Sequence, residues 1–179
     1  AERAKYLNPR EKAIMARGMS SAGIASVWKD MKPKERAEFL KEYSKNDRAG
    51  HVGLANQLKL ATRDESLQKK YNQEVAIASG NLNHAMQILG HGDKSPEELK
   101  AAKHNFLVDM EEDARKSFLS PDAIKSDVDV QTYVTNNFTL GDLRKYADGS
   151  DKLKAYAEVI NNPQFANSSL VKKIGSSPS

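Results

Sequence analysis

The segment Gly18–Lys45 carries the pattern that decides the fold, and its sequence is GMSSAGIASVWKDMKPKERAEFLKEYSK. Four apolar residues in its first half recur three or four positions apart: Ile24, Val27, Trp28 and Met31. This spacing puts all four on one face of a helix. A helix with one apolar face must bury that face against other elements, so the segment predicts helix-on-helix packing.

Pro33 divides the segment into two helices. A proline fits the first helical turn, because the amide hydrogen that it lacks would have no partner there anyway. We therefore predict helices over 20–31 and 33–45. The aromatic side chains of Trp28 and Phe39 are spaced to meet at the corner between these helices and to hold it.

The same kind of helix start recurs along the chain, with a capping residue, a proline and an acidic residue in sequence. It is found in Asn8-Pro9-Arg10-Glu11, Ser95-Pro96-Glu97-Glu98 and Ser120-Pro121-Asp122. At the helix over 20–31 we expect Ser21 to cap the first amides. Further helices are predicted over 9–17, 48–61, 64–79, 82–89, 96–118, 121–126, 140–160 and 168–174. The fold class is therefore all-α, a compact bundle of about eight to ten short helices with irregular, partly orthogonal packing and no significant sheet.

Two stretches carry more specific expectations. The helix over 96–118 is the longest, and we expect it to form the central strut of the C-terminal half. The alternation in Val128–Val134 is compatible with a strand, but one strand without a partner is unstable, so we expect an extended segment or a helical turn. Four glycines suit left-handed residues at helix ends: Gly18, Gly80, Gly90 and Gly149.

The charge distribution predicts two subdomains that share one core. Residues 1–50 carry 12 Lys and Arg against 7 Asp and Glu, whereas residues 101–150 carry 6 against 9. We place a basic N-terminal helical subdomain at 1–90 and a C-terminal one at 91–179, with a frayed tail at 175–179. The polar loop His91–Lys94 is the expected boundary.

The sequence lacks the residues and motifs of several kinds of catalytic, metal-binding and membrane-spanning protein. The chain has no cysteine, which excludes disulfides, thiolate metal sites and a cysteine nucleophile, and is compatible with the cytoplasm or with export without disulfides. It contains no Walker A loop, Gly-x-Ser-x-Gly elbow or His-Glu-x-x-His motif. No apolar stretch approaches the ~18 residues of a membrane span. We expect no catalytic residue, cofactor or metal site.

The four histidines are the only groups that titrate near neutral pH. His104 lies two turns from the acidic pair Glu111 and Glu112, and a metal site there would need a third ligand such as Asp93 or His91. We favour the simpler interpretation, that the histidines face solvent near helix ends.

Residues Trp28, Met31, Glu35, Arg36 and Phe39 follow a spacing that resembles the middle of an HMG box. The resemblance implies binding in the DNA minor groove, with an apolar wedge that bends the duplex. It covers a short part of the chain. The basic, proline-rich N-terminal strand of that family is missing before Arg10.

Three classes of function remain open. We favour a non-enzymatic helical module for protein–protein interaction or structural assembly, of the kind found in effectors, virions and multisubunit complexes. The first alternative is a nucleic-acid-binding protein that uses the helix pair over 20–45, and the second is an enzyme with scattered site residues. The expected contacts to an anionic partner are the basic residues Lys29, Lys32, Lys34, Arg36 and Lys41.

Overall fold

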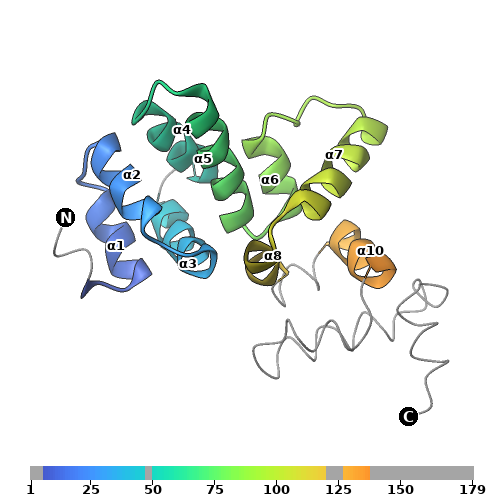
Figure 1. The fold of residues 1–179 in the computed structure, drawn as a ribbon, viewed down its shortest axis with the longest axis horizontal. Coiled ribbons are helices and arrows are strands. Elements are labelled where there is room, and N and C mark those ends of the chain that lie inside the picture. The colour runs from blue at the N-terminus through green and yellow to red at the C-terminus, as the bar shows by residue number, and fades with distance from the viewer. Residues whose placement is uncertain (1–5, 47–49, 120–126, 138–179) are drawn as a thin grey trace, which may run out of the picture.

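The computed structural model describes residues 6–46, 50–119 and 127–137, and within these ranges the chain is all-helical, with no strand (Figure 1). This confirms the predicted fold class. The helices are α1 (Pro9–Ala16), α2 (Ser21–Lys29), α3 (Pro33–Tyr43), the 3-10 helix η2 (Ser44–Asn46), α4 (Gly50–Leu60), α5 (Glu65–Ala78), α6 (Leu82–Ile88), α7 (Pro96–Asp109), α8 (Glu112–Phe118) and α10 (Val128–Asn137).

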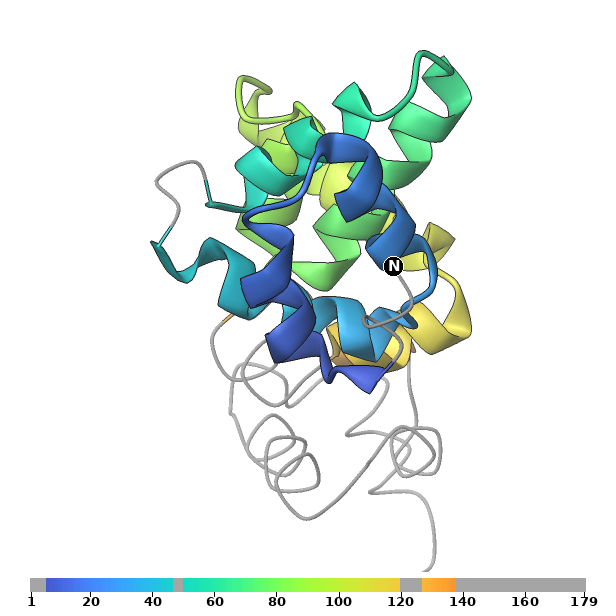
Figure 2. The ribbon, with the colours of Figure 1, turned by 90° about the vertical axis from the view of Figure 1, so that its left-hand side faces the viewer.

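Helix α5 lies at the centre of the bundle, where it contacts α3, α4, α6 and α8. Helices α1, α2 and α3 lie on one side of α5, and α7 and α10 lie on the other side (Figure 1). Figure 2 shows that α1, α2 and α3 cross one another instead of running parallel. One apolar side of α5 faces the core: Tyr71, Val75 and Ala78 are buried, and Leu67 is partly buried. Helix α5 is therefore the element around which most of the other described helices pack.

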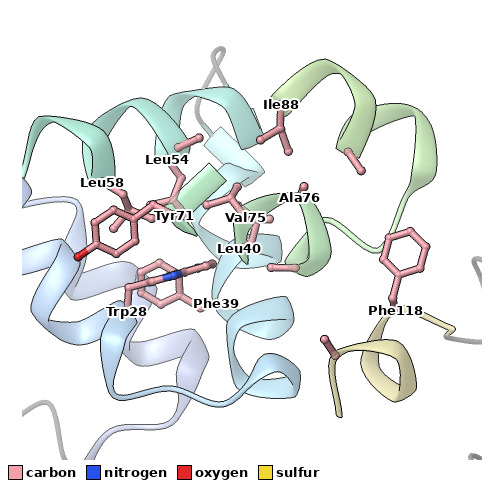
Figure 3. Close-up of a cluster of buried hydrophobic side chains, with 14 of the residues drawn as sticks. Trp28, Phe39, Leu40, Leu54, Leu58, Tyr71, Val75, Ala76, Ile88 and Phe118 are labelled. Atoms are coloured by element: carbon pink, nitrogen blue, oxygen red, sulfur yellow. The ribbon is translucent and has the colours of Figure 1, made fainter. Parts of the chain in front are cut away.

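The corner between α2 and α3 forms as predicted. The Trp28 side chain is 0% exposed, and its ring meets the Phe39 ring edge-on at 5.9 Å between centroids. Leu58 of α4 and Val75 of α5 complete this part of the core (Figure 3). The buried side chains, from Ala13 in α1 to Val134 in α10, belong to one cluster. The division into subdomains at 1–90 and 91–179 stays a prediction.

The helix starts follow the capping patterns in the sequence. The Asn8 side chain accepts from the Glu11 amide at 2.8 Å, and the Glu11 carboxylate accepts from the Asn8 amide, which completes a capping box. Ser95 caps α7 in the predicted way. At α2 the cap is Ser20, whose Oγ accepts from the Gly23 amide, so the expectation of Ser21 was wrong by one residue.

The prediction of one continuous helix over 96–118 is wrong, because the segment forms two helices, α7 and α8, that are separated at Met110. This residue has an extended backbone, with ψ of 136°, and Glu111 is then the N-cap residue of α8. The Arg115 guanidinium donates to three carbonyls at the end of α7, those of Leu107, Val108 and Met110, at 2.8–3.3 Å. These carbonyls would otherwise lack partners, so a side chain beyond the break stabilises it.

The expectation for 128–134 was also wrong, because this stretch belongs to the ten-residue helix α10. Asp127 accepts from the first amides of α10, and Asp129 pairs with Lys103 of α7 at 2.7 Å. Gly80 and Gly90 have the expected positive φ, whereas Gly18 does not. The helices predicted over 121–126, 140–160 and 168–174, Gly149 and the tail 175–179 lie outside the described residues.

Replacement of Trp28 by alanine tests the burial of the corner. We expect Trp28→Ala to lower the free energy of unfolding by about 3–5 kcal/mol, because a fully buried indole is lost and a cavity remains. Urea denaturation followed by circular dichroism measures this loss. As a control, Leu60→Ala removes a side chain that is 74% exposed, and it should cost less than about 0.5 kcal/mol. A loss below about 1 kcal/mol for Trp28→Ala would show that the ring is not buried.

Candidate functional site

A groove of about 290 Å³ lies where α3, α5 and the α7–α8 junction meet. Helix α5 supplies one wall, the first turns of α3 a second, and the break at Met110 a third. The residues that line the groove are Pro33, Arg36, Lys70, Gln73, Glu74, Ile77, Ala78, Asp109, Met110, Glu111 and Ala114.

The wall nearest α3 is fixed by an ion pair. The Arg36 guanidinium donates to the Glu74 carboxylate at 2.8 Å, and the two side chains are only 14% and 15% exposed. Glu74 also accepts from the Trp28 indole nitrogen at 3.2 Å, and Arg36 lies over the indole ring, 5.2 Å from its centroid. Arg36 Nε donates to the Trp28 carbonyl. Because each polar group has a partner, this wall is preorganised.

The rest of the lining combines apolar surface with free charges of both signs. Ile77 is partly buried against the core, and Met110 and Ala114 are buried beside it. Lys70 and the carboxylates Asp109 and Glu111 are exposed, and no ion pair among the described residues uses them. An apolar lining with a few polar groups at its edge is typical of binding sites.

The break between α7 and α8 places the two acidic residues at the groove. A continuous helix would carry Asp109 and Glu111 on different faces, since successive helical residues are about 100° apart. The extended Met110 between them instead brings both to the same lining. Reasoning from sequence missed this site, because the Arg115 contacts that stabilise the break are not visible as a motif.

A second, more polar hollow of about 240 Å³ adjoins the groove and shares Gln73 and Asp109 with it. Its lining includes His91, Lys94 and Asn105. Burial lowers the pKa of His91 from its ordinary value of 6.5, and the neighbouring Lys94 lowers it further. The expected boundary loop His91–Lys94 is a turn between α6 and α7.

The five basic residues predicted to contact an anion fall into two groups. Lys29, Lys32, Lys34 and Lys41 are exposed, and the first three surround the α2–α3 corner. Arg36 is turned inwards to Glu74 and Trp28, so its charge is already paired. Binding of an anion by the four exposed lysines stays a prediction.

The histidines and acidic residues considered as metal ligands do not come together. Among the described residues, no group of three or more His, Cys, Asp or Glu side chains has the arrangement of a metal site. His104 is exposed on α7 and belongs to no such group among the described residues. His51 and His84 are neighbours instead, with ring centroids 4.6 Å apart. They lie on α4 and α6, and no local spacing in the sequence indicates their contact.

Comparisons with protein-family models, curated proteins and solved structures found no match. The resemblance to an HMG box therefore gains no support from them, while its Trp28–Phe39 contact is explained by the helix corner. None of the described helices has the length and apolar composition of a membrane span. Function is accordingly argued from the geometry.

The His51–His84 contact predicts a pH-dependent stability. Burial lowers the pKa of His51 from 6.5, and His84 lowers it further. Below pH 6.5 the unfolded chain takes up a proton that the folded chain resists, so the free energy of unfolding falls as the pH falls toward the folded pKa. Above pH 6.5 this contribution is fully present.

We expect the free energy of unfolding to fall less in His51→Gln than in the parent chain when the pH is lowered from 7.5 to 5. Urea denaturation at both pH values measures this difference. His104→Gln is the matched control, since its side chain is exposed on α7. The same pH dependence in His51→Gln and the parent chain would contradict the assignment.

Proposed function

We propose that this chain is a non-enzymatic protein-binding module and that the groove beside α5 receives an apolar side chain of a partner protein. The observation that carries the proposal is the preorganised groove of about 290 Å³, with its apolar lining and exposed charges. This volume is just below the range of about 300–1,000 Å³ for small-molecule pockets. It suits one or two anchoring side chains of a protein segment better than a large cofactor.

The charges at the groove specify the kind of segment. Asp109 and Glu111 are exposed carboxylates on the α7–α8 side, and Lys70 is the exposed cation of the groove lining on α5. A basic residue next to the apolar anchor would pair with the two carboxylates, and an acidic residue at the other end would face Lys70. Such complementarity gives orientation and specificity to an interface more than it adds affinity.

Selection from a library of random displayed peptides tests the proposal. We expect the enriched peptides to combine an apolar anchor with an adjacent Lys or Arg, and to compete with one another for one site. The variant Asp109→Lys should weaken their binding at least about tenfold, because a repulsive charge replaces an attractive one. Ile77→Gln should weaken binding as well, because it removes apolar surface from the lining.

Matched controls separate the groove from the general surface. Glu38→Lys reverses a charge on the exposed side of α3, and Leu60→Gln removes an exposed apolar residue of α4. Both should bind the selected peptides as the parent chain does. Equal binding by Asp109→Lys, Ile77→Gln and the parent chain would refute the groove as the site.

A second candidate function, nucleic-acid binding, is favoured by the exposed lysines Lys29, Lys32 and Lys34 at the α2–α3 corner. Each phosphate contact releases counterions, so the logarithm of the affinity should fall with a slope of about −0.9 per contact against the logarithm of salt concentration. Titration of duplex DNA and of RNA between about 50 and 200 mM salt measures this slope. Absent or salt-independent binding of DNA and RNA would exclude this candidate function. If nucleic acid does bind at this corner, changing all three lysines to glutamine should abolish the binding.

A further inference from the structure

His51 of α4 and His84 of α6 form a contact that the groove does not involve. Their ring centroids are 4.6 Å apart, and their planes are tilted by 33°. His51 is half-buried and His84 is exposed, so one side of the pair is open to solvent. Helices α4 and α6 also contact each other through the bundle.

The spacing of the rings fits two ligands of one metal ion. With Zn–N bonds of about 2.0–2.1 Å, each imidazole centroid lies about 3.2 Å from the ion, so two rings on a tetrahedral or octahedral ion are about 4.5–5.2 Å apart. The observed separation of 4.6 Å lies at the octahedral end of that range, where the two metal–nitrogen bonds are about 90° apart. From this juxtaposition we infer that His51 and His84 form a two-histidine site for a borderline divalent cation, of the Zn²⁺ or Ni²⁺ type, that joins α4 to α6.

The environment of the pair keeps the ligands available. A metal ion binds the neutral imidazole, so we expect binding to strengthen as the pH rises above the ordinary histidine pKa of about 6.5. Water fills the remaining coordination positions on the open side of His84. Imidazole ligands without carboxylates select zinc or nickel over magnesium, which prefers oxygen ligands.

The site is expected to be weaker than a structural zinc centre. Structural zinc sites use four protein ligands, whereas this one supplies two. The pair also lies in the first turns of α4 and α6, where the helix dipoles oppose a cation. We therefore expect a dissociation constant in the micromolar range.

Calorimetric titration of the full chain with Zn²⁺ at pH 7.5, in a buffer that does not bind metals, tests the inference. The parent chain should bind one ion with micromolar affinity, and the variant His84→Gln should bind at least about tenfold more weakly. His84 is exposed, so this variant should keep the helical circular dichroism spectrum of the parent chain. Mg²⁺ should give no comparable heat.

The variants His104→Gln and His91→Gln are the matched controls, because each removes one histidine outside the pair. They should bind Zn²⁺ as the parent chain does. A thermal melt gives a second readout: at a zinc concentration about 100 times the dissociation constant, the folding equilibrium should shift about 100-fold toward the folded state, and this shift should be lost in His84→Gln. The inference is overturned if the parent chain binds no Zn²⁺ up to millimolar concentration, or if His84→Gln binds it as tightly.

Discussion

The carboxylate of Glu74 joins the central helix α5 to the α2–α3 corner, whose two donors lie 46 and 38 residues earlier in the sequence. One oxygen accepts from the Trp28 indole at the end of α2, and the other accepts from Arg36 in the first turns of α3. Glu74 itself lies on α5, the helix that contacts α3, α4, α6 and α8. A carboxylate that is only 15% exposed would be costly without partners, so the two donors and the acceptor stabilise one another. This interaction sets the position of the α2–α3 corner on the central helix.

The candidate groove is a consequence of that constraint and of a second one at Met110. Arg36 and Glu74 form one wall, so the wall is fixed by the same contacts that hold the corner. The opposite wall depends on Arg115, which satisfies the carbonyls at the end of α7 and leaves Asp109 and Glu111 free. The groove thus has rigid walls and unpaired charges, a combination that suits recognition of a partner with little loss of entropy on binding.

The features that depend on neighbouring residues were predictable from the sequence, and those that depend on distant ones were not. Asn8 and Ser95 cap their helices through an amide three residues away, which a capping motif describes. The Trp28–Phe39 corner also follows from local spacing. The break at Met110 and the contact between His51 and His84 depend on tertiary packing, and no periodicity in the sequence indicates them.

A double-mutant cycle between Arg36 and Glu74 tests the central claim most directly. The free energies of unfolding of the parent chain, Arg36→Met, Glu74→Gln and the double variant give the coupling energy of the pair. Because both side chains are largely buried, the account predicts a favourable coupling of about 1–3 kcal/mol. A coupling indistinguishable from zero would show that the pair does not tie the α2–α3 corner to α5, and it would contradict the account.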